Sequence, residues 1–402
     1  MTQEKKIIYL DNAATTLIKP PIFFESISDK FTKLANSGRG VYKASLDASH
    51  DILHTRQLLA DFLQLQNIAN IIFTPGCTYS INTSLHGFIN QSKFKDYKLN
   101  ILVSPIEHNA VMRLLNYYEK IDKIKIHYLD YDLQNTIDYH ELKQYINSNK
   151  IDLIILNHAS NVTGQIINLD KFFSTINKSI PVLIDAAQSF PYINLNLKDN
   201  NISFIALAGH KCLMGPIGTG ILYINDNFTD INPLVFGGTG SFSDNYNMPE
   251  FLPDKFEAGS INAALISALG ASFEYLINSD IKTSLHNQLE LTYYFIDWCQ
   301  SKNNIIEIFG VAKSINFDSY LKNYLPVVSF RVKAIDNSLV VNFLNEKYNI
   351  CLRSGIHCAA LTHKNLNSIE TGLIRLSLGH FNTKNDIDAL IHALNEFIKT
   401  YT

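Results

Sequence analysis

Two side chains near the middle of the sequence have the types and the spacing that a cofactor site needs. Asp185 ends the apolar run VLID, and Lys211 follows His210 in a turn ahead of the glycine-rich segment 215–220. Pyridoxal 5'-phosphate (PLP) needs both: a lysine amine forms the covalent imine link to its aldehyde, and a carboxylate keeps its pyridine nitrogen protonated so that the ring accepts electrons. The pair therefore predicts a PLP site with Lys211 as the point of attachment.

A second segment has the features of an anion site. The strand predicted over residues 71–74 is followed by Pro75, Gly76, Cys77 and Thr78 and then by a helix from about residue 79 to 89. Free N–H groups and the positive end of the helix dipole attract an anion at such a place, and Thr78 adds a hydroxyl. The same residues also fit an ordinary helix cap, so this segment alone leaves both interpretations open.

Strands and helices alternate through the first part of the chain. Residues 7–14 predict a short strand that ends in a turn. Apolar runs predict strands over 71–74, 101–104, 124–128, 151–157, 182–184, 202–207 and 220–224. Helical spacing predicts helices over 21–35, 44–64, 79–89, 138–146 and 169–176, with another beginning near 107. This alternation predicts a largely parallel sheet with helices on both faces. Such sheets bind ligands beyond the carboxyl ends of their strands. The residues that follow predicted strands, and that we expect to share one site, are Thr78, His108, residues 157–161, Asp185 and Lys211.

The later part of the chain has a different order of predicted elements. Residues 225–258 are predicted to be irregular, and long helices over 261–279 and 283–302 precede strands over 305–309, 327–332, 350–353 and 373–378. A last helix is expected to begin at Thr383, with Asp386 in its first turn. With 402 residues, the chain is long enough for two domains. We expect a large domain over 1–255, whose residues 1–20 pack with the other domain, and a smaller α+β domain over 256–402.

Composition excludes several classes of protein. The net charge of −3 does not indicate a basic surface that would bind nucleic acid or an anionic membrane. The sequence predicts no signal peptide and no run long enough to span a bilayer, so we expect a cytoplasmic protein. The cysteines form no CxxC pair and no close group with histidine, which predicts neither a disulfide framework nor a metal site. These cysteines are Cys77, Cys212, Cys299, Cys351 and Cys358.

Read in order, eight short stretches resemble one family. They are YLDNAATT (9–16), IIFTPGCTYSIN (71–82), EHNAV (107–111), NHASNVTGQ (157–165), VLIDAAQS (182–189), AGHKCLMGPIGTGILY (208–223), FEAGSIN (256–262) and LRSGIHCAAL (352–361). The chain resembles the class V aminotransferase fold family, and within it the group II (Suf-type) cysteine desulfurases and selenocysteine lyases. The resemblance implies the type I PLP-dependent transferase fold, an α/β fold with a mainly parallel sheet in its large domain.

The resemblance also implies a role for each matching residue around the cofactor. Lys211 is the attachment lysine, Asp185 the partner of the pyridine nitrogen, Gln188 a hydrogen-bond partner of the cofactor's phenolate oxygen, and His108 a ring stacked on the cofactor that also helps to move protons. The residues implied for the phosphate are Gly76, Cys77, Thr78 and His210, together with Ser241 reaching the cofactor of a neighbouring subunit.

For the substrate, the resemblance implies that Arg375 and Asn161 hold a carboxylate, with Arg353 close by. A guanidinium suits that task because its planar fork donates two parallel hydrogen bonds. Cys358 matches the cysteine that accepts sulfur as a persulfide, and we expect its neighbours in sequence, His357 and Arg353, to favour its thiolate.

The implied reaction converts L-cysteine to L-alanine and passes the sulfur from Cys358 to an acceptor protein, as in iron–sulfur cluster assembly. The family builds its sites between two subunits, so the resemblance also implies a homodimer. Three positions depart from the family: Cys77 stands in place of a first threonine, Ala208 in place of a hydroxyl residue, and Tyr42 in place of a histidine.

Several alternative functions stay open at this point. Within the family they are a selenocysteine lyase acting on L-selenocysteine, a cysteine C–S lyase that does not use Cys358, an epimerase and an aminotransferase. Outside it, the departures at Cys77 and Ala208 leave room for a catalytically silent dimer that acts as a binding or scaffold protein.

Overall fold

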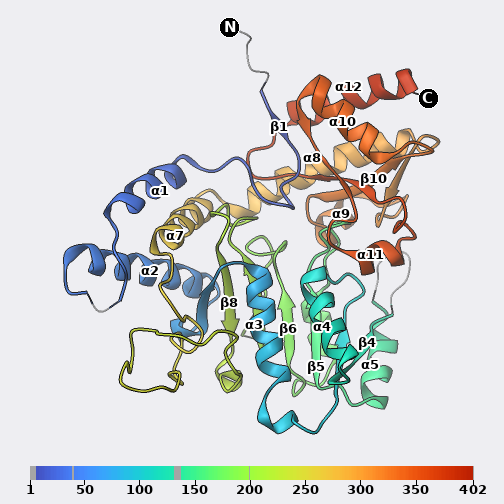
Figure 1. The fold of residues 1–402 in the computed structure, drawn as a ribbon. Helices are drawn as coiled ribbons and strands as arrows, with labels where there is room; N and C mark the ends of the chain where they lie inside the picture. The colour runs from blue at the N-terminus through green and yellow to red at the C-terminus, as the bar shows by residue number, and fades with distance from the viewer. Residues whose placement is uncertain (1–5, 39, 131–136, 199, 402) are drawn as a thin grey trace.

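The computed structural model describes residues 6–38, 40–130, 137–198 and 200–401. Figure 1 shows a larger body built around a sheet and a smaller body that carries the C-terminus. The N-terminal segment runs from the smaller body towards the larger one. Among the described residues, no helix is both long and apolar enough to cross a membrane.

The large sheet is mainly parallel, as predicted. Its seven strands lie in the order β2-β8-β7-β6-β5-β3-β4. Their bounds are β2 Ile71–Thr74, β3 Leu99–Val103, β4 Ile124–Tyr128, β5 Leu153–Asn157, β6 Val182–Asp185, β7 Phe204–Ala208 and β8 Gly220–Ile224. Only β8 runs against its neighbours, β2 and β7. Every residue of β5 to β8 is buried, because these strands are apolar runs covered on both faces.

Helices cover both faces of this sheet. The helices of the larger body are α1 Pro21–Lys33, which packs on α7, and α2 Lys43–Phe62, α3 Cys77–Ile89, α4 Asn109–Lys120, α5 Tyr139–Ser148, α6 Leu169–Thr175 and α7 Ala263–Asn278. Short 3-10 turns lie at Ile68–Asn70, Ser92–Phe94 and Asp226–Phe228. One apolar core joins the sheet to α2, α5, α6 and α7, and a separate core joins it to α3 and α4. The strand ends are thereby fixed between two packed layers.

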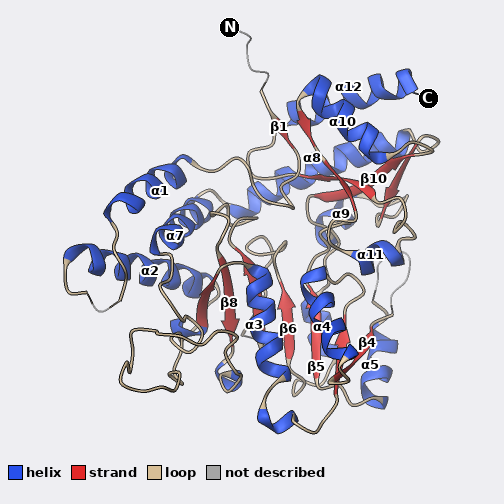
Figure 2. Ribbon diagram, in the orientation of Figure 1, coloured by secondary structure: helices blue, strands red, loops and turns tan. Residues whose placement is uncertain are grey.

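The smaller body is built on a four-stranded antiparallel sheet in the order β12-β13-β10-β9. Its strands are β9 Ile306–Phe309, β10 Val327–Val332, β12 Arg353–Gly355 and β13 Leu373–Ser377, and its helices are α8 Ile281–Ser301, α9 Phe317–Asn323, α10 Asn337–Tyr348, α11 Ala360–Asn365 and α12 Lys384–Tyr401. Figure 2 shows α8, α10 and α12 gathered beside this sheet. All three helices contribute to one apolar core with the strands.

The short strand ending in a turn that was predicted over 7–14 is present: β1 covers Ile8–Tyr9 and a turn follows at 12–14. One predicted strand is wrong in extent. The strand predicted over 350–353 is two strands: β11 (Ile350–Cys351) pairs with β1, whereas β12 joins the four-stranded sheet. The pairing of β1 with β11 joins the start of the chain to the smaller body. The domain boundary at residue 255 stays a prediction, and α7, which follows it, packs in the core of the larger body.

The last helix begins where the sequence predicts. Asp386, in its first turn, accepts a hydrogen bond from the Thr383 backbone N–H at 2.9 Å. Three shorter helices, α9, α10 and α11, were not predicted. Each is shorter than the long helices on either side of that region.

Candidate active site

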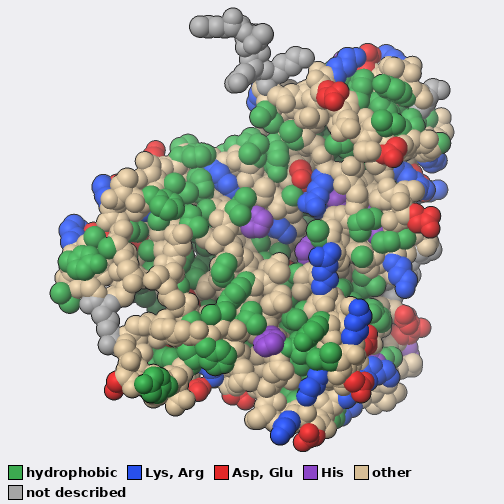
Figure 3. Space-filling model, viewed as in Figure 1, with side chains coloured by type: hydrophobic (Ala, Val, Ile, Leu, Met, Phe, Trp, Pro, Cys, Tyr) green, Lys and Arg blue, Asp and Glu red, His purple; other side chains and the backbone are tan. Residues whose placement is uncertain are grey.

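A cavity of about 670 Å³ opens where the carboxyl ends of the parallel strands face the smaller body. Figure 3 shows histidine and basic side chains near the middle of this face, between the two bodies. The predicted site residues that line the cavity are Gly76, Cys77, Thr78, His108, Asn161, Asp185, Gln188, His210, Lys211, Arg353, Cys358 and Arg375. The structure therefore brings together residues from both parts of the chain, as the strand ends predict.

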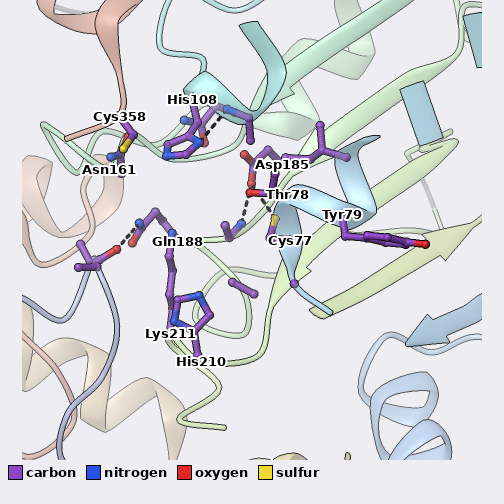
Figure 4. Close-up of a pocket in the computed structure, with 18 of the residues that line it drawn as sticks. Cys77, Thr78, Tyr79, His108, Asn161, Asp185, Gln188, His210, Lys211 and Cys358 are labelled. Atoms are coloured by element: carbon purple, nitrogen blue, oxygen red, sulfur yellow. Dashed lines mark hydrogen bonds between the residues drawn. The ribbon is translucent and has the colours of Figure 1, made fainter. Parts of the chain in front are cut away.

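Asp185 lies at the buried end of β6. Its Oδ1 accepts a hydrogen bond from the Ala187 backbone N–H at 3.0 Å and a weaker one from the Cys77 thiol at 3.7 Å. Burial, and then the charge of Asp185, hold the pKa of the Cys77 thiol well above its usual range. Cys77 is therefore a neutral thiol that donates towards Asp185, as Figure 4 shows.

The N-terminus of α3 faces the same cavity. Gly76 is the residue that precedes the helix, no side chain caps it, and Gly76 to Tyr79 all line the cavity. A side chain at Gly76 would meet no atom within 4 Å, so the space in front of this helix end is open. Uncapped N–H groups beside an open space form an anion site.

The turn that carries Lys211 is held by the N-terminal segment. Thr15 and Thr16 both donate hydrogen bonds to the His210 carbonyl, at 3.1 and 3.2 Å. Lys19 donates to the Gly215 carbonyl at 2.8 Å, and burial lowers its pKa to about 8. Thr15 and Thr16 belong to the stretch YLDNAATT (9–16), which resembles the family but for which the sequence predicts no individual roles.

His210 itself is a neutral ring. Burial lowers its pKa to about 4, and the charges of Lys211 and Lys19 act in the same direction. Its Nδ1 atom is buried and has no hydrogen-bond partner among the described residues. The His210 Nδ1 is therefore available to bind another group close to the turn that carries Lys211.

His108 both lines the cavity and caps α4. Its Nδ1 accepts a hydrogen bond from the Ala110 backbone N–H at 3.1 Å. Burial lowers its pKa to about 4, against an opposing effect of Asp185. A neutral ring that accepts at Nδ1 carries its proton on Nε2.

Glu107 is a buried carboxyl for which the sequence alone predicts no role. Its Oε1 accepts hydrogen bonds from Ser104 at 2.6 Å and from the Asn157 backbone N–H at 2.7 Å, whereas its Oε2 has no partner among the described residues. Burial, with a smaller effect from Asp185, raises its pKa to about 8. The group is protonated at neutral pH and ties the end of β3 to the end of β5.

Gln188 and Asn161 are each held by a backbone carbonyl. The side-chain amide of Gln188 donates to Ala13 at 2.9 Å, and that of Asn161 donates to His357 at 2.7 Å. An amide group has two N–H donors, so each keeps one for another partner. The Asn161 Oδ1 atom is buried without a partner among the described residues.

Arg375 is buried on β13, with 1% of its side chain exposed. It donates one hydrogen bond to Asp11 and another, at 3.0 Å, to the Asn161 carbonyl. Burial lowers its pKa, and Asp11 opposes this shift. Asp11 is a residue that the sequence analysis left without a role, because the two residues are far apart in the chain.

Cys358 is exposed, in the loop between β12 and α11. The prediction that His357 favours its thiolate is wrong: burial, and then the charge of Arg375, lower the pKa of His357 to about 2, so its ring is neutral. Of the two neighbours expected to help, only Arg353 carries a positive charge.

Two residues lie apart from the cavity. Ser241 does not line it, and its hydroxyl donates to Asp254 at 2.5 Å within the irregular 225–258 region. Its predicted role concerns a second subunit and stays a prediction. Tyr42, which stands where the family has a histidine, is exposed before α2 and does not line the cavity either.

Comparisons with known proteins give the family of this chain. The family described as "Aminotransferase class-V" matches residues 8–390. A "Probable cysteine desulfurase" from Borreliella burgdorferi is 29% identical over 405 residues, which cover 98% of this chain and 92% of the relative. One of the same description from Pyrococcus abyssi is 28% identical over 406 residues, covering 100% of this chain and 96% of the relative.

Solved structures are similar along almost the whole chain. The apo structure of a cysteine desulfurase from Thermococcus onnurineus has a TM-score of 0.87 and 25% identity, and covers 98% of this chain and 95% of that one. The cysteine desulfurase CsdA from Escherichia coli has a TM-score of 0.83 and 26% identity, and covers 98% and 96%. With the family match extending over most of the sequence, this chain belongs to the aminotransferase class-V family.

Proposed function

We propose that this protein is a PLP-dependent cysteine desulfurase. It converts L-cysteine to L-alanine and transfers the sulfur to Cys358 as a persulfide. The observation that carries the proposal is that one cavity contains Lys211, Asp185 and Cys358, which come from three separate segments. An amine, an acid and a thiol at one place are the groups that this reaction needs.

The residues present fit PLP. A phosphate fits the uncapped end of α3, where the space before Gly76 is open, and His210 offers a buried Nδ1 atom without another partner. Asp185 would hold the pyridine nitrogen, and the Cys77 thiol beside it is neutral and adds no competing charge. Gln188 has a free N–H for the phenolate oxygen, and Lys211 would attach the aldehyde.

When bound, PLP would supply an electron sink that weakens the bonds at the substrate's α-carbon. Lys211 is the base for the α-proton. His108 is neutral and accepts a hydrogen bond from Ala110 through Nδ1, so its Nε2–H is the group that remains to donate a proton. A donor and a base of this kind are the requirements for moving protons at the substrate.

The substrate carboxylate would be held by Arg375 and by the free N–H of Asn161, with Arg353 nearby. Sulfur transfer follows as a displacement: the Cys358 thiolate forms an S–S bond with the substrate sulfur. The carbon–sulfur bond breaks, its electron pair stays with the substrate, and protonation of the substrate gives alanine.

The functional unit would be a homodimer. Large apolar side chains are exposed along α1, α2 and the segment between them, and Figure 3 shows this patch over those helices. They include Ile22, Phe24, Phe31, Val41 and Leu46. An apolar patch of this kind is typical of a protein–protein interface. In a dimer, Ser241 would reach the neighbouring cofactor, and the exposed Cys358 would pass its sulfur to an acceptor protein.

Product analysis tests the proposal. Purified protein with PLP and L-cysteine should give alanine, and mass spectrometry should find one added sulfur atom on Cys358. Cys358→Ala should lose both, whereas Cys351→Ala, which removes another thiol of the smaller body, should lose neither. Undiminished alanine and sulfide in Cys358→Ala would contradict the persulfide mechanism, and pyruvate in place of alanine would indicate a C–S lyase. L-selenocysteine in the same assay separates a selenocysteine lyase.

A further inference from the structure

The loop that carries Cys358 has an unusual backbone. Both His357 and Cys358 have φ in the left-handed region, at 51° and 56°. Residues with a side chain adopt this conformation only where surrounding contacts impose it, and such residues gather at functional sites. The conformation of the loop is therefore a property of its contacts, which can be named.

The backbone of the loop is held from the larger body. The Cys358 carbonyl accepts from the backbone N–H of Asn109 at 2.8 Å, and the His357 carbonyl accepts from the Asn161 side chain at 2.7 Å. Ala359 packs in a small apolar cluster with Val162 and Leu373. These contacts hold both sides of the cysteine.

The side chain of His357 is held by the smaller sheet. Its Nε2 lies 3.0 Å from the Leu373 carbonyl, which only accepts, so Nε2 carries the proton of the neutral ring. Its Nδ1 is then an acceptor. That atom is buried and has no partner among the described residues.

A second buried histidine lies against this ring. His363, on α11, is fully buried, and its ring centroid is 5.6 Å from that of His357. Its Nδ1 lies 2.9 Å from the Ser368 hydroxyl, and its Nε2 has no partner among the described residues. Burial lowers its pKa, so both rings are neutral. Two buried imidazole nitrogens without a hydrogen-bond partner lower the stability of the folded protein, whereas apolar side chains at these positions would not. Their presence indicates that the two histidines have a specific role.

We propose that His363 is a positioning residue for Cys358. Ser368 fixes the ring of His363, this ring supports the ring of His357, and His357 holds the left-handed turn that presents the thiol to the cavity. The proposal rests on the proposed function, in which Cys358 is the residue that accepts sulfur.

The test compares three variants with the wild-type holoenzyme. His363→Phe keeps the ring and removes both nitrogens, His363→Gln restores a polar end group, and His286→Phe is a matched control at an exposed histidine of α8. The measurements are the single-turnover rate of persulfide formation, KM for L-cysteine, and hydrogen exchange of the amides in the peptide 354–361.

We expect His363→Phe to keep its melting temperature, its cofactor absorbance and its KM. Its loop amides should exchange faster, and it should form the persulfide about tenfold or more slowly, because small misplacements of a reacting group carry such penalties. His363→Gln keeps a polar partner for Ser368 but has no ring to support His357, so it should stay slow, and the control should match wild type. A purely structural role would lower the melting temperature and cofactor binding together and would not give this pattern.

A wild-type rate and wild-type loop exchange in His363→Phe would overturn the proposal. If that variant does not fold, Ser368→Ala decides, because it frees the His363 ring without enlarging any side chain: a slowed rate supports the positioning role and a normal rate overturns it. Failure of the proposed function is distinguishable, since the wild-type protein would then form no persulfide. In that case loop exchange alone decides whether His363 holds the turn.

Discussion

Arg375 donates a hydrogen bond to Asp11, which lies 364 positions away in the sequence. The guanidinium is almost fully buried, and Asp11 is its carboxylate partner among the described residues. A buried cation that loses its partner is strongly destabilising, by about 3–5 kcal/mol. The proposed carboxylate-binding arginine therefore depends on a residue from the opposite end of the chain.

Replacing Asp11 should accordingly affect stability and substrate binding together. Asp11→Ala should lower the free energy of unfolding by about 3–5 kcal/mol and raise KM for L-cysteine, because Arg375 loses its orientation. Asp11→Asn keeps a hydrogen-bond acceptor and should lose less. Urea unfolding and steady-state kinetics measure both effects, and Asp47→Ala, at an exposed ion pair with Lys43, is the control. Equal stability of the Asp11 and Asp47 variants would contradict the prediction.

Lys211→Ala should abolish the visible absorbance that attached PLP gives, and should abolish alanine formation. The reason is that no other lysine lines the described cavity. Lys143→Ala, at an exposed position of α5, should behave as wild type in absorbance and in activity. A spectrum of Lys211→Ala that matches wild type would instead favour a silent binding or scaffold protein.

Glu107 should make stability fall as pH rises. Its pKa is raised from 4.5 to about 8 in the folded protein, so between these values the folded state binds a proton that the unfolded state has lost. In that window this group lowers the free energy of unfolding by about 1.4 kcal/mol per pH unit. The stabilisation that protonated Glu107 gives the folded protein is fully present below pH 4.5 and is lost as pH approaches 8.

Glu107→Gln keeps the shape and removes the titration. Relative to wild type, this variant should gain stability steadily between pH 5 and pH 8 in urea unfolding. Glu346→Gln, at an exposed position of α10, should follow the wild-type curve. Parallel pH profiles for wild type and Glu107→Gln would show that the carboxyl is already ionised in the folded protein.

Removing a hydroxyl group from the proposed phosphate site should weaken PLP binding, and adding one should strengthen it. Thr78→Val removes one and should weaken PLP binding about tenfold, since a hydrogen bond to a charged group contributes about 1.5–3 kcal/mol. Ala208→Ser adds one at a position that lines the cavity and should strengthen binding by a similar factor. Fluorescence titration of the apo protein with PLP measures both, and unchanged affinities would argue against a phosphate at this end of the sheet.

Sequence patterns predicted the large sheet well because its strands are locally distinct. Three strands, β2, β4 and β8, match the predicted bounds, and the residues after the strand ends meet in one cavity. Burial on both faces gives β5 to β8 largely apolar runs, which can be recognised without knowledge of the strands they pair with.

The features that were predicted wrongly, or not at all, depend on contacts with residues far away in the sequence. The segment 350–353 was predicted as one strand, but Leu352 separates residues that pair with β1 from residues that pair with β13. In the same way, the role of Asp11 appears only once Arg375 lies beside it, and the neutral state of His357 follows from burial that its neighbours in sequence do not reveal.

The contacts of residues 8–16 have a consequence for synthesis of the protein in the cell. β1 pairs with β11, Thr15 and Thr16 support the Lys211 turn, and Asp11 holds Arg375. The large sheet can form while the ribosome is still translating, but the N-terminal segment has no partner strand until residues near 350 emerge. A nascent chain therefore carries an open cofactor cradle from the time its large sheet is complete until residues near 350 emerge and the active site can close.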